Sequence, residues 1–280
     1  MKLDNTTVAI TGAASGIGRA LAERLAHRGC SLALADVEPA PLEDVVAELS
    51  QITATVGMVT DVGDAAQVEQ FAAATVAEFG GVDVAVNNAG VSTFNLIQDQ
   101  TVDDWRWVVD VNLMGVVHGI AAFLPRLATR PRAHLVNVAS VAGIQSGIAF
   151  LGPYAATKAA VVSISETLHQ ELAAYQPHVS VTVLCPANTD TAVMRSERNR
   201  PAGLPVEQRR PDAEAWRSGI EDSFTGPTGR TPDDVAIQLI DGIEADRLFV
   251  LTHAEMAPVL TQRLQRVIDA VESESARVGG

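Results

Sequence analysis

Cysteine is scarce in this chain. Only Cys30 and Cys185 occur among 280 residues, so cysteine alone cannot build a metal site, and two such thiols are typical of buried core residues. The histidines that could act as ligands share no metal-binding spacing: His118, His134, His169, His178 and His253. The sequence therefore predicts no metal centre.

Positive charge is also in short supply. Lysine and arginine together number 20 against 34 aspartates and glutamates, which gives a net charge of −14. Nucleic acids and anionic membranes select basic surfaces, so we expect neither as a partner. Any anionic ligand must be held by a local arrangement of donors.

Long apolar runs and flexible linkers are missing as well. Within residues 1–30, charged side chains interrupt every apolar stretch: Arg19, Glu23, Arg24 and Arg28. This argues against a signal peptide or a membrane span and for a cytoplasmic protein. Because no Pro-, Gly- or Ser-rich linker precedes residue 186, we expect a single domain over residues 1–280, long enough for a full core and a deep cleft.

The chain does have a regular alternation of short apolar runs and helix-period segments. Runs rich in Val, Leu and Ala predict strands near 7–10, 31–36, 55–60, 82–87, 134–139 and 179–184. Helix periodicity lies between them, near 17–25, 40–50, 64–79, 102–128 and 155–175. Nearly continuous apolar strands are buried on both faces. The sequence therefore predicts an α/β fold, a single Rossmann-type doubly wound parallel sheet of about seven strands with helices on both faces.

The last third of the chain departs from this pattern. Residues 186–230 are rich in Arg, Pro, Gly, Glu and Asp with little periodicity, which predicts a substrate-binding loop or lid without regular structure. Beyond it we expect a helix near 232–245 and a strand at 248–251. A C-terminal extension over 253–280 contains an expected amphipathic helix near 254–272, which covers either the site or a partner's edge.

Tyrosine and lysine are rare, and one of each shares a short segment. The chain has two of either residue, and Tyr154 and Lys158 lie four positions apart among alanines. Alanine favours helix, which would place both side chains on one face about 5–6 Å apart. A cation that close lowers a tyrosine pKa by roughly one to three units and permits proton exchange near neutral pH. Taken alone, the spacing is equally compatible with an ordinary helix that carries one aromatic and one solvated lysine.

A glycine-rich turn follows the first expected strand. Residues 11–18 read TGAASGIG, with the spacing G-x-x-x-G-x-G, and such glycines let backbone N–H groups approach a pyrophosphate. Asp36 ends the next strand, where a carboxylate can bind both ribose hydroxyls and repel a 2′-phosphate. Neither Ser15 nor Val37 is the cation that a 2′-phosphate needs. The sequence thus predicts NAD as cofactor, although a plain tight turn and a surface acid would leave the same pattern.

These motifs occur in a familiar order. With the glycine turn, Asn87-Asn88-Ala89-Gly90, Ser140 and Tyr154-x-x-x-Lys158, residues 5–252 resemble the short-chain dehydrogenase/reductase family. The resemblance implies an oxidoreductase with four catalytic residues: Asn112, Ser140, Tyr154 and Lys158. It also implies a set of cofactor-binding residues: Gly12, Ser15, Gly16, Ile17, Gly18, Asp36, Asp61, Val62, Asn88, Tyr154, Lys158, Thr189 and Thr191.

The same resemblance implies a role for each of these positions. The glycine turn would hold the pyrophosphate, Asp61 and Val62 the adenine, and Asn88 the adenosine ribose. Thr189 and Thr191 would reach the carboxamide. At the reacting end, Ser140 would hydrogen-bond the substrate oxygen, Lys158 the nicotinamide ribose, and Asn112 a water that leads to the lysine.

The chain departs from the family pattern at two places near the site. Ser140 precedes Tyr154 by 14 residues, one more than is usual in the family, and we expect the loop around residues 145–147 to absorb the insertion. The usual Pro-Gly after the sixth strand is Pro186-Ala187 here. A Cβ at position 187 is expected to reshape the floor of the pocket.

The substrate is only weakly specified by the sequence. Five apolar residues are candidates to line its pocket, with core burial as the alternative: Phe94, Ile144, Phe150, Leu151 and Met194. Three short phrases, including Cys185-Pro186-Ala187-Asn188, resemble a subgroup with bacterial Cα-dehydrogenases of lignin-derived aryl alcohols. The run Arg195–Arg200 could bind a substrate carboxylate, although alternating Arg and Glu is more typical of a solvated face.

These observations lead to one functional hypothesis and its rivals. We expect NAD-dependent interconversion of a hydrophobic secondary alcohol, of aryl, steroid or terpenoid type, and its ketone, with Tyr154 as acid and base. The alternatives are an NADPH-dependent carbonyl or 3-oxoacyl reductase, which Asp36 disfavours, and a non-catalytic NAD-binding sensor or scaffold. An apolar helix face of Val161, Ile164 and Leu168 suggests a homodimer or homotetramer, unless the protein's own core buries it.

Overall fold

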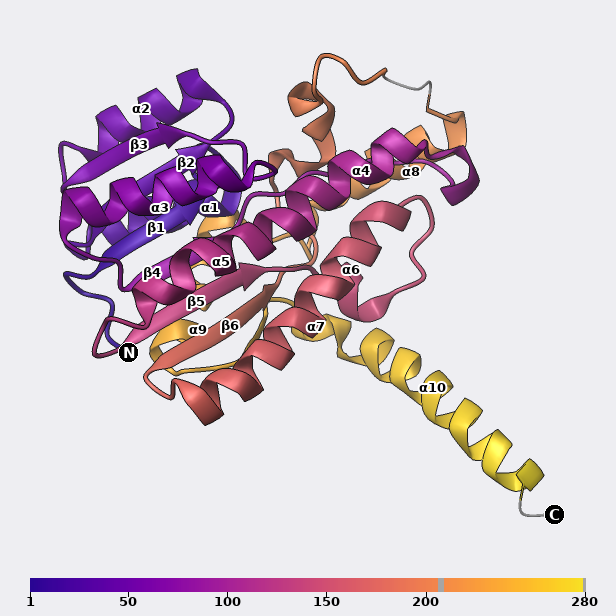
Figure 1. Cartoon of the computed structure of the whole chain (residues 1–280). Coiled ribbons are helices and arrows are strands. Elements are labelled where there is room, and N and C mark those ends of the chain that lie inside the picture. The colour runs from indigo at the N-terminus through magenta and orange to yellow at the C-terminus, as the bar shows by residue number, and fades with distance from the viewer. Residues whose placement is uncertain (206–208, 279–280) are drawn as a thin grey trace.

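The computed structural model describes residues 1–205 and 209–278. Its centre is a seven-stranded sheet in the order β3-β2-β1-β4-β5-β6-β7, with every neighbouring pair parallel (Figure 1). The strands are β1 (Thr7–Thr11), β2 (Ser31–Asp36), β3 (Thr55–Val59), β4 (Val84–Asn87), β5 (Ala133–Val138), β6 (Val179–Cys185) and β7 (Phe249–Leu251). Each strand expected from the sequence is present, so the parallel α/β prediction is confirmed.

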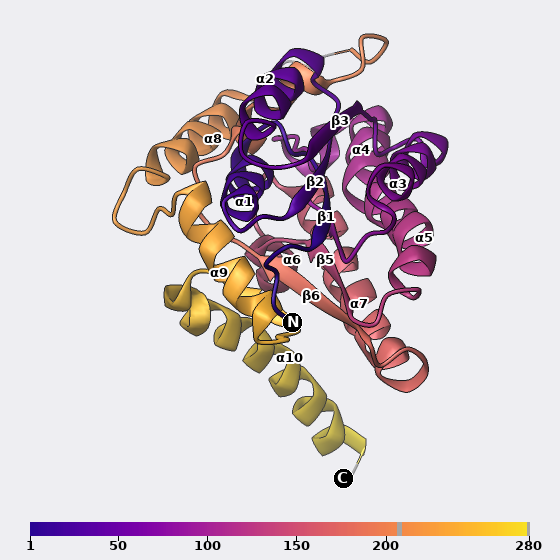
Figure 2. The same cartoon turned by 90° about the vertical axis from the view of Figure 1, so that its left-hand side faces the viewer.

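Helices cover both faces of this sheet, as the turned view shows (Figure 2). One layer consists of α1 (Gly16–Ala26), α2 (Pro39–Leu49) and α9 (Pro232–Glu244), and the other of α3 (Ala65–Phe79), α5 (Gly115–Leu127) and α7 (Gly152–Tyr175). A large apolar cluster fills the space on each side of the sheet. The fold is therefore doubly wound, as the alternating pattern predicts.

The strand order reverses between β1 and β4. The chain first builds outward from β1 to β3 and then returns to place β4 on the other side of β1. At such a switch point the loops after the two strands diverge and leave a crevice beyond their carboxyl ends. The glycine turn after β1 and Asn88 after β4 both lie there.

The expected helix over 102–128 is a continuous run with an irregular turn in its middle. It consists of α4 (Val102–Val109), a π-helical turn (Asp110–Met114) and α5. Thr101 caps α4 through a reciprocal pair of bonds with Asp104. By length and composition the run could cross a membrane, but 44% of its most apolar stretch is buried inside the fold, which is the position of a core helix.

Residues 186–230 contain helices, contrary to the prediction of a lid without regular structure. The segment includes the 3-10 helix η3 (Ala192–Asn199) and the helix α8 (Pro211–Ser223). Both are amphipathic elements whose few apolar residues, among them Met194 and Trp216, pack with Phe94 and Phe224 in a separate cluster. The low apolar content of the segment concealed their periodicity.

The expected apolar face of α7 is largely used within the subunit. Val161 and Leu168 are buried in two apolar clusters of the subunit, and Ile164 is half-buried. Core burial thus explains this face, and it does not support an oligomer. The remaining short elements are η1 (Ile97–Asp99), α6 (Val141–Gln145) and η4 (Ala254–Met256), followed by α10 (Ala257–Val278), which extends away from the body (Figure 1).

Candidate active site

A cavity of about 800 Å³ opens at the carboxyl ends of the strands. Its size is in the range of pockets that hold a cofactor or a small-molecule ligand. Most of the residues that the sequence singles out line it: Gly12, Ser15, Gly16, Ile17, Asp36, Asp61, Val62, Asn88, Ser140, Tyr154, Lys158, Thr189 and Thr191. Gly18 and Asn112 do not, and both have a packing role instead.

The glycine turn forms one wall of the cavity. Gly12 and Gly16 have φ angles of 65° and 54°, a region that glycine occupies without steric cost. A Cβ on Gly16 would come within 3.2 Å of the Thr191 side chain, so the turn and η3 approach each other closely. Gly18 faces inward, since a Cβ there would lie 2.2 Å from the Gly12 carbonyl oxygen. It therefore allows α1 to pack on the turn and does not line the cavity.

Asp36 lies at the end of β2, beside the turn. One carboxylate oxygen accepts from the Ala14 N–H at 2.9 Å and the other from the Glu38 N–H at 3.1 Å. These bonds fix the carboxylate at the wall of the cavity, with acceptor capacity left for ribose hydroxyls. The position and the donor set fit the ribose of a dinucleotide.

Asn88 and Asp61 hold the loops beside the glycine turn. The Asn88 amide donates to the carbonyls of Thr11 and Gly12, at 2.9 and 3.0 Å, and so ties the end of β4 to the glycine turn. Asp61 is exposed and accepts from the Gly63 N–H, while Val62 is buried beside it. Asn88 thus positions the turn as well as bordering the cavity.

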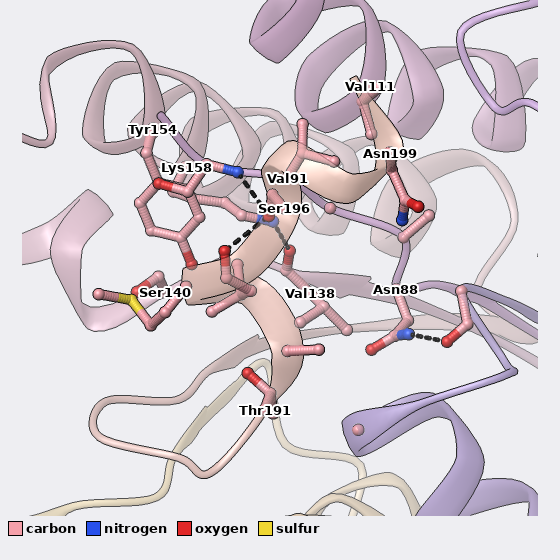
Figure 3. Close-up of a pocket in the computed structure, with 18 of the residues that line it drawn as sticks. Asn88, Val91, Val111, Val138, Ser140, Tyr154, Lys158, Thr191, Ser196 and Asn199 are labelled. Carbon is pink, nitrogen blue, oxygen red and sulfur yellow. Dashed lines mark hydrogen bonds between the residues drawn. The ribbon is translucent and has the colours of Figure 1, made fainter. Parts of the chain in front are cut away.

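Tyr154, Ser140 and Lys158 meet at the opposite end of the cavity (Figure 3). Tyr154 lies in the first turn of α7, and Lys158 follows one turn later, with its Nζ 5.7 Å from the centroid of the Tyr154 ring. The Lys158 ammonium donates to the Val138 carbonyl at 2.7 Å. Both side chains therefore lie on one helix face, as the spacing predicts.

The direction of the Tyr154 pKa differs from the sequence-based expectation. Burial raises the pKa of Tyr154 above its ordinary value, and a hydrogen bond between the Ser140 and Tyr154 hydroxyls offsets only part of that rise. Burial also lowers the pKa of Lys158 to about 8. Because Lys158 donates to a backbone carbonyl near the ring and not to the phenol oxygen, its charge does not outweigh the desolvation of the phenol.

Ser140 is held at the N-terminus of α6. Its hydroxyl accepts from the Ala142 N–H at 3.1 Å and donates to the Pro186 carbonyl at 3.3 Å. The turn after α6 contains Ser146 and Gly147, both with positive φ angles. The prediction that this loop absorbs the extra residue before Tyr154 stays a prediction, and the serine lies beside the tyrosine.

Asn112 is fully buried in the π-helical turn and does not line the cavity. Its side chain exchanges two hydrogen bonds with the Val91 backbone, at 2.8 and 2.9 Å, and donates to the Thr157 hydroxyl. A Cβ on Gly90 would lie 3.4 Å from both the Asn112 carbonyl oxygen and the Lys158 Nζ. Asn112 thus joins the loop after β4 to α7 and lies close to the lysine.

A buried histidine that sequence reasoning left unassigned holds the loop after β6. His253 accepts from the Ala187 N–H at Nδ1, 3.4 Å away, and its Nε2 lies 3.1 Å from the Asn188 carbonyl. Thr252 bonds the same Nδ1 at 2.6 Å. This arrangement holds the atypical Pro186-Ala187-Asn188 step in place beside the cavity. A histidine two residues after a short strand gave no signal in the sequence.

One part of the cavity has an apolar lining. Of the five candidates, Phe94, Leu151 and Met194 line it, whereas Ile144 packs in the core and Phe150 does not line it but contacts the Trp216 ring at 5.9 Å with a tilt of 51°. The helix α8 adds residues that the sequence analysis missed: Trp216, Ile220 and Phe224. Their spacing of four was the one available signal.

Arg200, which ends the arginine run, anchors η3 and is not a free anion site, whereas the Arg195 side chain is 66% exposed. Arg200 is almost fully buried, pairs with Asp104 at 2.5 Å and with Glu197 at 2.6 Å, and stacks on the Trp107 ring at 4.9 Å. The predicted alternatives of a substrate carboxylate site and a solvated face are both wrong for Arg200. No group of three His, Cys, Asp or Glu side chains in the described part of the chain could hold a metal ion.

Comparisons with known proteins agree with this geometry. The model of the short chain dehydrogenase family matches residues 6–202. The chain is 33% identical over 267 residues to a C alpha-dehydrogenase of Sphingobium sp. (strain NBRC 103272 / SYK-6), covering 94% of this chain and 85% of that protein. It is 30% identical to a CLA biosynthesis dehydrogenase/reductase of Lactiplantibacillus plantarum, covering 92% of each.

Solved structures give the same result. A short-chain dehydrogenase/reductase from Burkholderia phymatum in complex with NAD has a TM-score of 0.91 and 36% identity, covering 95% of each chain. The apo form of LigD from Sphingobium sp. strain SYK-6 has a TM-score of 0.78 and 29% identity, covering 96% of this chain and 98% of that one. The expected likeness to lignin-type dehydrogenases is confirmed at the level of similarity. From its fold, its motifs and these matches, the chain belongs to the short-chain dehydrogenase/reductase family.

Proposed function

We propose that this protein is an NAD-dependent oxidoreductase that interconverts a hydrophobic secondary alcohol and its ketone. The observation that carries the proposal is the single cavity. It places the glycine turn and Asp36 at one end and the Tyr154, Ser140 and Lys158 side chains at the other, beside an apolar wall. A non-catalytic NAD sensor would not need that second group.

The residues present fit a dinucleotide. A Cβ would intrude on the turn at Gly12 and Gly16, Asp36 offers a carboxylate to the ribose, and Lys158 and Thr189 border the far end of the cavity. When bound, NAD supplies the hydride acceptor of the oxidation and NADH the hydride donor of the reverse reaction. Asp36 favours NAD over NADP because its charge repels a 2′-phosphate.

Tyr154 carries the proton in this scheme. In the oxidation its phenolate accepts the hydroxyl proton of the substrate, while the Ser140 hydroxyl donates a hydrogen bond to the same oxygen. In the reduction the neutral phenol returns the proton. Because burial raises the Tyr154 pKa, the phenolate forms only on the alkaline side. Oxidation should therefore become faster as the pH rises, and reduction should become slower.

The substrate is proposed to be an aryl or similarly bulky apolar secondary alcohol. Phe94, Met194, Trp216 and Phe224 supply an apolar wall near Tyr154, and a relative with 33% identity is a C alpha-dehydrogenase. Steroid and terpenoid alcohols suit the same wall and belong in the screen.

The decisive experiment combines a substrate screen with one substitution. NADH formation is followed by absorbance with NAD or NADP and a panel of aryl, steroid, terpene and aliphatic secondary alcohols. For the best substrate, Tyr154→Phe should lower kcat by about 10²–10⁴-fold while NAD affinity stays unchanged. Tyr175→Phe is the matched control. Tyr175 is 84% exposed at the last residue of α7 and does not line the cavity, so its kcat should equal that of wild type.

The outcomes separate the rival functions. Near-normal turnover by Tyr154→Phe would contradict the assignment of Tyr154. A clear preference for NADPH with ketones would favour a carbonyl or 3-oxoacyl reductase. Tight NAD binding with no turnover of any alcohol would favour a sensor or scaffold.

We place the protein in the cytoplasm and expect a homodimer or homotetramer. The acidic composition and the absence of cysteine pairing among the described residues support a reducing compartment. The projecting helix α10 exposes Leu264, Val267 and Ile268, and an apolar stripe of this kind favours association. Light scattering that gives a monomer mass would contradict the oligomer.

A further inference from the structure

Two residues at the end of η3 contact a single acidic residue, Glu38, at the border of the cavity. The Arg198 guanidinium donates to the Glu38 carboxylate from Nη2 at 2.7 Å and from Nε at 3.0 Å, and the Asn199 amide donates to the same oxygen at 3.0 Å. Burial by itself would raise the pKa of Glu38, but the bonds from Asn199 and Arg198 hold it below its usual value. Glu38 is therefore an anion paired with a cation from a segment 160 residues away.

This contact lies where a 2′-phosphate would have to fit. Glu38 follows Asp36 by two residues, and its N–H donates to the Asp36 carboxylate. All four side chains of the contact border the same cavity: Asp36, Glu38, Arg198 and Asn199. Since Asp36 marks the adenosine ribose, the Glu38–Arg198 pair is at the ribose end.

The Arg198 guanidinium is held in a geometry that could bind a phosphate, but its N–H groups already donate to other acceptors. Its Nη1 donates to the carbonyls of Ala192 and Arg195, which fixes the guanidinium on its own helix. The Nε and Nη2 atoms then point to Glu38. Arginine is the side chain best suited to a phosphate because its fork binds two oxygens. With Glu38 present, that fork is neutralised.

The other cations that line the cavity are paired with other groups. Among the described residues that line it, the remaining cations are Lys158, at the catalytic end, and Arg106, which pairs with Asp103 on α4. A 2′-phosphate would thus meet two carboxylates and one occupied guanidinium.

We propose that Glu38 and Arg198 form a second cofactor-selecting element, in which the acid excludes NADP by occupying a lid arginine that would otherwise bind the 2′-phosphate. The inference rests on the proposed function, because it assumes a dinucleotide with its adenosine ribose at Asp36. Selection of NAD over NADP would then depend on Asp36 and also on a residue pair from two segments far apart in the sequence. Removal of the Glu38 carboxylate should free the Arg198 Nε and Nη2 donors, which are then able to bind the 2′-phosphate.

A double-mutant cycle tests this directly. Dissociation constants for NAD, NADP, adenosine 5′-monophosphate and adenosine 2′,5′-bisphosphate are measured by calorimetry on wild type, Glu38→Ala, Arg198→Ala and the double variant. Glu38→Ala should improve the affinity for NADP and for the bisphosphate by about tenfold or more relative to the unphosphorylated partner. Arg198→Ala should give no such gain, and the double variant should lose it.

Two further variants serve as controls. Glu38→Gln removes the charge but keeps an oxygen that accepts from Arg198, so its gain should be smaller. Asn199→Ala removes a contact of η3 without a change of charge, so its selectivity should match wild type. Glu38 occupies the N-cap position of α2 without a capping bond from its side chain, and Glu38→Ala should therefore leave the helix intact, as circular dichroism can verify.

The results that overturn the proposal are distinct from those that overturn the function. An unchanged NADP to NAD ratio in Glu38→Ala would refute it. An equal gain in Arg198→Ala would also refute it, because opening of η3 would then explain the effect. If wild type already binds NADP more tightly than NAD, the proposed cofactor preference fails, whatever the cycle shows.

Discussion

Gly143→Ala probes the contact that places Ser140 beside Tyr154. Gly143 lies in α6, whose N-cap is Ser140, and it packs directly on the α7 backbone at Lys158. A Cβ at position 143 would lie 2.5 Å from the Lys158 carbonyl carbon, 2.6 Å from its oxygen and 2.7 Å from the Ala159 nitrogen. These are backbone atoms, so no side-chain rotation can relieve the overlap.

The size of the required movement follows from these distances. Ordinary contact begins near 3.4 Å, so the two helices must separate by about 0.9 Å, the difference between 3.4 and 2.5 Å. An overpacked core contact of this kind costs about 1–3 kcal/mol of stability. A displacement of about 1 Å between reacting groups can cost about 10²-fold in rate. We therefore expect a large fall in kcat. The loss of NAD affinity should be much smaller, because only the Lys158 end of the cofactor site moves while the glycine turn and Asp36 lie on other elements.

The assay measures kcat with the best alcohol, the NAD dissociation constant and the free energy of unfolding in urea. Gly219→Ala is the matched control, since nothing lies within 4 Å of the added Cβ on the exposed side of α8. Alanine in a helix should raise stability there by about 0.5–1 kcal/mol. Turnover of Gly143→Ala close to wild type would refute the idea that α6 and α7 rigidly set the distance between serine and tyrosine.

Three further predictions concern buried polar contacts. Burial lowers the pKa of His134 to about 4 from 6.5, so the folded state binds fewer protons than the unfolded state between those values. The free energy of unfolding should then fall by about 3 kcal/mol as the pH drops from 6.5 to 4, and urea titrations of His134→Gln should lack this loss; an unchanged acid dependence would contradict it. His253→Ala should weaken NAD binding more than it weakens adenosine 5′-monophosphate binding, with partial rescue by His253→Gln; equal losses for both ligands would indicate a general structural role. Arg200→Met leaves Asp104 without its buried partner at 2.5 Å. The free energy of unfolding should therefore fall by about 3 kcal/mol, and proteolysis around η3 should become faster. A wild-type proteolysis rate would show that Arg200 does not anchor η3.

The sequence determined the features that depend on short stretches of chain. Buried parallel strands need continuous apolar runs, and a tight turn next to a pyrophosphate needs glycine, so the sheet and the Gly12–Gly18 turn could be predicted from local patterns. The Tyr154 and Lys158 spacing likewise fixed their common helix face. The family resemblance supplied the roles of Ser140 and Asn112, which by residue type alone are an ordinary cap and an ordinary helix residue.

Only the tertiary structure decided the features that join distant segments. The pKa of Tyr154 depends on how deeply the phenol is buried and on the carbonyl that Lys158 binds, and neither is visible in the spacing. Contacts with α4 and with the start of α2 hold η3, and α8 packs on η3 and on Phe94, so the weak periodicity of these two helices did not reveal them. Glu38 and Arg198 are 160 residues apart, and His253 meets the loop after β6 only because β7 lies beside β6. Local sequence fixes the elements and their chemistry, whereas charge pairing and burial depend on which elements the fold brings together.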